Sequence, residues 1–142
     1  VINTLLNTKA YISQKMSPGM YERVDMIDPS IKNMLYLITF NDSNNDGLLN
    51  ELDNADLYIS NIDGSDLRQI TKDIHILDFD FTNNNKEVYM VFQKRDSTSN
   101  EYKRKLFAKY KIEEDTLVEF TGLHKRILEL EKKLMIDTLS TQ

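Results

Sequence analysis

The sequence predicts a mainly β fold made of two four-stranded antiparallel sheets followed by a C-terminal α-helix. Short apolar runs rich in β-branched and aromatic residues alternate with turn residues through the middle of the chain. This series of runs occurs twice, and the last segment changes to helical spacing. The 142 residues are the size of one ordinary domain, so we expect a single domain spanning 1–142.

The first unit is predicted over residues 21–71. Its expected strands, each a run of mostly apolar residues, are 24–28, 34–40, 57–62 and 67–71. Asp63-Gly64 lies between the last two runs and is a hairpin turn signal. The unit should therefore fold as a meander of four strands.

The second unit, 72–121, repeats this pattern. Residues 77–79 match 24–26, and 88–91 match 35–38, both at an offset of 53 residues. A repeat of about 50 residues is typical of propeller blades, and a blade is a four-stranded antiparallel sheet. Two blades cannot close a ring, since propellers usually have about 4–8. The chain is therefore a fragment of a longer propeller, part of an assembly of chains, or two sheets packed as a sandwich.

The N-terminal segment has an ambiguous apolar pattern, whereas the C-terminal segment has a clear helical one. Residues 1–20 form an N-terminal segment in which 1–16 fit either a helix or a strand, followed by a turn signal at 17–19. The C-terminal segment, 122–142, contains Leu123, Ile127, Leu130 and Leu134 at spacings of four, three and four. This spacing predicts a helix over about 122–137. We expect it to pack on the last sheet, with an oligomer contact as the alternative.

Residues 42–53 carry the spacing of a calcium-binding loop. Calcium takes six to eight oxygen ligands, which a twelve-residue loop supplies from positions 1, 3, 5, 7, 9 and 12. Gly47 occupies position 6, where the chain turns sharply, and Leu49 at position 8 is expected to face the core. The predicted metal ligands are Asp42, Asn44, Asp46, the Leu48 carbonyl, Asn50 and Asp53.

The composition around this loop also favours a cation. From residue 33 to residue 67 there is no Lys or Arg, whereas there are seven acidic side chains. Asp53 stands where the usual motif has Glu, and its shorter side chain predicts weak binding, with a Kd of about 10⁻⁴–10⁻³ M. The alternative is a polar hairpin loop that binds nothing, because Asn, Asp and Gly also suit ordinary turns.

Residues 56–71 resemble a blade motif of TolB-type β-propellers, in which an Asp-hydrophobic-Tyr strand leads through Asp-Gly-Ser to an Arg-x-hydrophobic-Thr strand. The second unit resembles it less, since Glu113-Glu114-Asp115 replaces the Asp-Gly turn. The loop at 42–53 resembles EF-hand and dockerin calcium loops. These resemblances imply one structural calcium ion in an exported bacterial protein, either periplasmic, envelope-anchored or secreted.

Composition excludes several classes of function. The chain has no cysteine, which excludes disulfides and thiolate chemistry. The net charge of −5 argues against nucleic acid as a partner, and no apolar run approaches the length of a membrane span. His75 and His124 stand outside any metal or triad motif and are expected to be packing or surface residues.

The function favoured by the sequence is a non-enzymatic binding module whose partner is a protein or a cell-envelope component. The alternative is a propeller-type hydrolase or lyase, in which Asp25 and Asp78 face Lys109 or Lys111 in one pocket. The first unit is acidic and the second basic, so a homo-oligomer in which the two attract stays open as well.

Overall fold

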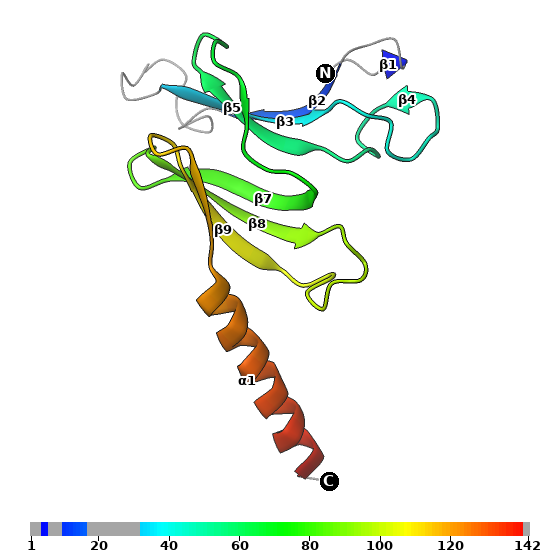
Figure 1. The fold of residues 1–142 in the computed structure, drawn as a ribbon, viewed down its shortest axis with the longest axis vertical. Coiled ribbons are helices and arrows are strands. Elements are labelled where there is room, and N and C mark those ends of the chain that lie inside the picture. The colour runs from blue at the N-terminus through cyan, green and yellow to red at the C-terminus, as the bar shows by residue number, and fades with distance from the viewer. Residues whose placement is uncertain (1–3, 6–9, 17–31, 141–142) are drawn as a thin grey trace.

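The computed structural model describes residues 4–5, 10–16 and 32–140. These residues form two four-stranded antiparallel sheets, one small two-stranded sheet and one helix (Figure 1). The first sheet consists, in spatial order, of β2 (Tyr11–Met16), β3 (Asn33–Thr39), β5 (Asp56–Asn61) and β6 (Arg68–Gln69). The second sheet consists of β7 (Ile74–Thr82), β8 (Glu87–Lys94), β9 (Leu106–Lys111) and β10 (Thr116–Glu119).

The expected fold class is confirmed, because both sheets are sequential four-stranded meanders. The first sheet takes its first strand from β2, which lies in the segment 1–20 that the sequence analysis separated from the first unit. Residues 11–16 are therefore a strand and not a helix. The strand expected at 24–28 and the turn expected at 17–19 lie outside the described residues.

The two sheets share a detail of construction in their first strands. The pairing of β2 with β3 shifts register between Ile12 and Gln14, and the pairing of β7 with β8 shifts between Ile76 and Asp78. Such an irregularity increases local twist and bends the strand. In β7 it lets both Ile76 and Phe79 reach the core, which a strict alternation of side chains does not allow.

The hydrophobic core lies between the two sheets. Leu35, Leu57 and Ile59 come from the first sheet and are fully buried. They pack in one cluster with side chains of the second sheet, where Met90 and Phe92 are as deeply buried. Each sheet thus covers an apolar face of the other, and Figure 1 shows the first sheet stacked on the second.

Two arginines tie the sheets together at their margins. Arg95 follows β8 and donates from Nη2 to the Ala55 carbonyl at 2.8 Å, while its Nη1 lies 3.8 Å from the Asp56 carboxylate. Arg68 of β6 lies 3.9 Å from the carboxylate of Asp115 in the turn between β9 and β10. These links fix the position of one sheet on the other where the apolar core ends.

The helix α1 (Thr121–Ser140) confirms the expected C-terminal helix, but it does not pack along the last sheet. Figure 1 shows it leaving the second sheet and extending away from the β-strands. His124, in its first turns, is 9% exposed, and its Nε2 accepts the Phe107 amide proton at 2.8 Å. Further along, Leu130 is 44% and Leu134 is 65% exposed. The expected packing was wrong because only the start of the helix reaches the sheet.

His124 is a packing histidine, as expected, since its ring also lies 6.2 Å from the ring of Phe107.

Within the residues that the structure describes, no helix combines the length and the apolar character needed to cross a membrane.

We predict that the stability of the protein falls between about pH 10 and pH 12 through Tyr110. Burial, together with the hydrogen bond that its hydroxyl donates to Asp115, raises the pKa of Tyr110 to about 12. A raised pKa contributes stability that is complete below the unfolded value of about 10 and is lost as the pH rises toward the folded value. Urea denaturation across this range should show a smaller loss for Tyr110→Phe than for wild type.

The matched control is Tyr102→Phe, because Tyr102 is 40% exposed and lies outside the core. This variant should follow the wild-type pH profile. An unchanged alkaline loss in Tyr110→Phe would contradict the assignment to Tyr110.

Candidate metal centre

The loop at 42–53 is an excursion between two strands that are direct neighbours in the first sheet. β3 ends at Thr39, β5 begins at Asp56, and the two pair in register with Leu37 opposite Leu57. Within the loop, β4 (Leu48–Leu49) pairs with β1 (Thr4–Leu5) in the small two-stranded sheet. Leu49 is 2% exposed, so its side chain faces the interior as position 8 predicted. The loop is therefore held at both of its ends and in its middle.

The first half of the loop turns its side-chain oxygens toward its own backbone. The amide of Asp46 donates to Oδ1 of Asp42 and to Oδ1 of Asn44, at 3.1 Å in each case. The other carboxylate oxygen of Asp42 accepts the Gly47 amide at 2.9 Å. Because two oxygens converge on one amide nitrogen, the side chains at positions 1 and 3 lie on the same side of the loop.

Backbone conformation follows from the residue types at two positions of the turn. Gly47 has φ of +85°, which glycine adopts without the steric cost that a Cβ brings. Asn45 has φ of 60°, and Asn is among the few other residues that tolerate this region. Gly47 thus fills the place at position 6 for the reason that the sequence predicted.

Asp53 closes the second half of the loop onto the first. Its Oδ1 accepts the amides of Ser43 at 2.8 Å and of Asn44 at 3.3 Å, and its Oδ2 accepts the amide of Asn50 at 3.1 Å. Asp53 and Asn50 are each 7% exposed. The carboxylate at position 12 therefore lies beside position 3, although nine residues separate them in sequence.

The loop carries negative charge that no basic side chain neutralises in the described part of the chain. None of its three aspartates, Asp42, Asp46 and Asp53, takes part in an ion pair with a described Lys or Arg. Burial raises the pKa of Asp53, but hydrogen bonds from the amides of Asn50, Asn44 and Ser43 outweigh it and hold this pKa below its usual value. Asp53 is thus a carboxylate at neutral pH.

The donor chemistry of the loop fits calcium. Every predicted ligand offers a carboxylate, amide or backbone oxygen, which a hard cation prefers. An ionised carboxylate has about four lone-pair sites, so Asp42, which accepts two amides, keeps acceptor capacity. Asp53 already accepts four hydrogen bonds, from three amides and the Ser43 hydroxyl. Among the described residues no three His, Cys, Asp or Glu side chains form a compact metal-binding group. The fit therefore rests on the mixed set of Asp, Asn and backbone oxygens.

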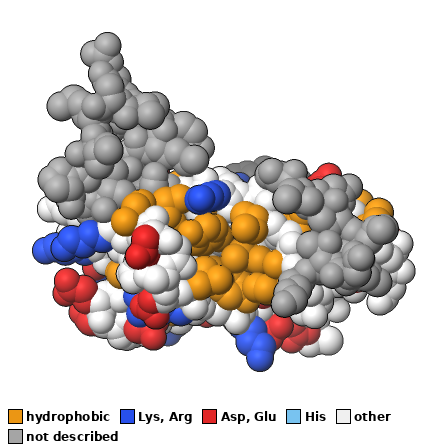
Figure 2. Space-filling view, turned by 90° about the horizontal axis from the view of Figure 1, so that it is seen from above, with side chains coloured by type: hydrophobic (Ala, Val, Ile, Leu, Met, Phe, Trp, Pro, Cys, Tyr) orange, Lys and Arg blue, Asp and Glu red, His pale blue; other side chains and the backbone are white. Residues whose placement is uncertain are grey.

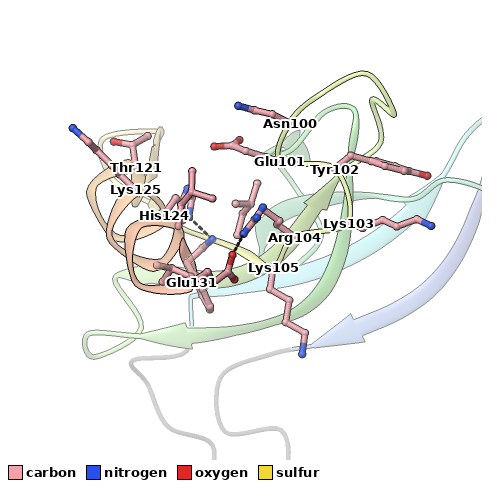
Figure 3. A pocket seen from close by; sticks show the side chains of 14 residues that line it. Asn100, Glu101, Tyr102, Lys103, Arg104, Lys105, Thr121, His124, Lys125 and Glu131 are labelled. Atoms are coloured by element: carbon pink, nitrogen blue, oxygen red, sulfur yellow. Dashed lines mark hydrogen bonds and ion pairs between the residues drawn. The ribbon is translucent and has the colours of Figure 1, made fainter. Parts of the chain in front are cut away.

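A second feature, absent from the sequence analysis, is a cleft of about 760 Å³ between α1 and the segment 100–107 (Figure 3). Arg104 bonds Glu131 of the helix across it. Figure 3 shows that the side chains of Lys103, Lys105 and Lys125 point away from one another. The cleft thus lacks converging cations, and its residues come from segments with no shared sequence signal.

The residues of the hydrolase or lyase alternative do not form a described site. Asp25 lies outside the described residues. Lys109 pairs with Glu87 at 3.6 Å, and Lys111 pairs with Glu114 at 3.4 Å. Asp78 bonds the amide of the next residue, Phe79, at 3.0 Å, in the manner of a backbone-capping aspartate.

Comparison with known proteins gave no match to a protein-family model, to a curated protein or to a solved structure.

We predict that Asp53→Asn destabilises the protein by about 1–3 kcal/mol, because an amide nitrogen replaces an oxygen that accepts buried backbone N–H groups. The wild-type carboxylate has a lowered pKa, so its stabilisation is present above its unfolded pKa of about 4 and is lost as the pH falls through the folded value. Urea denaturation at neutral pH and at acid pH measures both effects.

The difference between wild type and Asp53→Asn should shrink on acidification. A difference that is equal at neutral and acid pH would show that the carboxylate charge is not what closes the loop.

Proposed function

We propose that the protein is an exported, non-enzymatic interaction module whose loop at 42–53 binds one structural calcium ion. The observation that carries the proposal is the inward convergence of Asp42 and Asn44 on the Asp46 amide, with Asp53 folded beside them. Side-chain oxygens at positions 1, 3 and 12 thus lie close to one another within the loop. Such a loop loses little conformational entropy when it binds a cation.

Charge supports the same conclusion. The three aspartates of the loop, none of them paired with a described basic side chain, repel one another, and a divalent cation relieves this repulsion. Calcium fits better than magnesium, because the donors are spread over a flexible loop and magnesium demands near-ideal octahedral geometry. The ion would brace the connection between β3 and β5, which supports a structural role.

The interaction role rests on an apolar face of the first sheet. The face turned away from the core carries Ile12 opposite Ile38 and Tyr36 opposite Tyr58. Ile12 is 40% exposed, whereas Ile38 is buried. Phe40 packs edge-on against Tyr58 at 5.5 Å and is 45% exposed. Figure 2, which views the molecule from above, shows hydrophobic side chains gathered in one patch. A contiguous apolar patch of this kind is typical of a protein-binding surface.

The partner we propose is a protein or a component of the cell envelope, in keeping with the resemblance of residues 56–71 to TolB-type blades. The same apolar face supports a second candidate, in which the two sheets are blades of a longer propeller and a third blade covers the patch. In both cases the first sheet uses its two faces, one for the core and one for a neighbour.

We predict that calcium binds with a Kd of about 10⁻⁴–10⁻³ M and raises the melting temperature relative to chelator. At a calcium concentration about a hundredfold above Kd the stabilisation should be about 2.7 kcal/mol. Isothermal calorimetry and thermal melting measure the two quantities. Asp46→Ala should abolish both, since it removes a predicted carboxylate ligand. The described hydrogen bond that this carboxylate accepts, from the Leu48 amide, is exposed, so its loss should cost little stability.

The matched control is Asp96→Ala. Asp96 lies in the corresponding loop of the second sheet and caps a similar turn by accepting from the amide of Thr98 at 2.9 Å. This variant should bind calcium as wild type does. No heat and no shift in melting temperature at millimolar calcium would sink the calcium proposal.

We predict that Phe40→Lys prevents capture of an envelope protein that the wild type cross-links in a detergent extract of cell envelopes, because a lysine places a charge in the apolar patch. Tyr102→Lys is the control, since Tyr102 is an aromatic residue of similar exposure, 40% against 45%, on the second unit. Equal capture by both variants would exclude the patch as the binding surface. The candidate in which a third blade covers the patch would then explain why it is apolar.

A further inference from the structure

We propose that α1 pairs with α1 of a second copy of this chain to form a short parallel coiled coil. The proposal is independent of the calcium loop and concerns the one helix of the described residues. It starts from the observation that this helix carries apolar side chains at exposed positions.

The helix contacts the segment 100–107 along its first half. His124 contacts Phe107, and Glu131 bonds Arg104 across the cleft. Beyond these contacts the helix extends away from both sheets (Figure 1). In proteins most of the stability of a helix comes from packing of an amphipathic face, so this 20-residue helix is expected to bury an apolar face.

An apolar face is present and largely exposed. Leu123 is 45%, Leu130 is 44% and Leu134 is 65% exposed, and Ile127 completes the row. At about 100° per residue, the row lies about a quarter of a turn around the helix from His124, Leu128 and Glu131, which line the cleft. Ile127 lies at the edge of the row nearest to them and also lines the cleft. A second helix along the row therefore packs next to the segment 100–107 at Ile127.

The residue types along the row favour a coiled coil of two parallel helices. The spacing of four, three and four places Ile127 and Leu134 at a positions of a heptad, and Leu123 and Leu130 at d positions. A β-branched residue at a with Leu at d favours a parallel dimer. Ile127 is the central a residue, between the two d leucines.

Charge complementarity favours the same orientation and a second copy as the occupant. In this register Arg126 and Lys133 are at g, and Glu131 is at e. A parallel pair brings Arg126 of each copy next to Glu131 of the other, which gives two opposite-charge contacts by symmetry. An antiparallel pair would instead place Arg126 near Lys133, which repel.

The ion pairs within the chain do not prevent this arrangement. Arg126 lies 3.7 Å from Glu129, but both side chains are more than half exposed, so the pair contributes little and exchanges easily. Glu131 has two carboxylate oxygens and can accept from Arg104 of its own chain and from Arg126 of the partner.

Sedimentation equilibrium over a range of concentrations tests the proposal. The full chain should show a concentration-dependent monomer–dimer equilibrium, because a row of two heptads is short. Leu130→Glu should raise the dimer Kd by at least about a hundredfold, since a symmetric dimer loses two buried leucines and gains two buried charges. Met135→Glu is the control: Met135 is 67% exposed on the same helix but lies outside the row.

A monomer at every concentration, or a dimer that Leu130→Glu leaves intact, would overturn the proposal. Each measurement is made in calcium and in chelator. Dimerisation should be equal in the two, so failure of the calcium loop and failure of the coiled coil are separately visible.

Orientation is tested with cysteine, which the natural chain lacks. Leu123→Cys should form a disulfide-linked dimer on mild oxidation, because a parallel pair places the two copies of position 123 side by side. An antiparallel pair places position 123 opposite position 134. Cross-linking only in a mixture of Leu123→Cys with Leu134→Cys would therefore overturn the parallel arrangement.

Discussion

The packing of the two sheets against each other is the contact on which the rest of this structure depends. A four-stranded meander with one apolar face is not stable until that face is covered. Here the first sheet supplies Leu35, Leu57 and Ile59, and the second supplies Met90 and Phe92, among others, to one cluster. These side chains belong to one cluster, so each sheet buries an apolar face against the other.

Polar contacts at the margin of this interface fix its geometry more than they stabilise it. Arg95 and Asp56 are both partly buried, and burial moves their pKa values toward the neutral forms, lowering that of Arg95 and raising that of Asp56. Removal from water thus offsets much of their attraction at 3.8 Å. The hydrogen bond from Arg95 to the Ala55 carbonyl sets where β5 lies relative to the end of β8.

The two functional proposals use parts of the chain that this body leaves outside the core. The loop at 42–53 leaves the first sheet between paired strands, so its ends are held close together, while Asp46 stays exposed and Asp53 is buried. The helix leaves the second sheet after β10 and keeps its apolar row exposed. The two packed sheets therefore carry the loop at 42–53 at one side and the helix at the other (Figure 1).

The sequence by itself determined the features that depend on local pattern. Alternating apolar runs gave β3, β5, β8 and β9, heptad-like spacing gave α1, and Asp, Asn and Gly spacing gave the loop that turns at Gly47. Each of these depends on residues close together in the chain. The hydrogen bonds that Asp42 and Asn44 accept from the Asp46 amide also join residues close together in the chain.

Tertiary structure alone decided which segments meet. The first sheet takes β2 as its outer strand, although Tyr11–Met16 carries an ambiguous pattern, because strand choice depends on pairing with β3. The pairing of β1 with β4, the Arg104–Glu131 contact and the exposure of the helix likewise join residues that are distant in sequence. No periodicity encodes such contacts, since they arise when whole sheets bury their apolar faces and leave other elements at the edge.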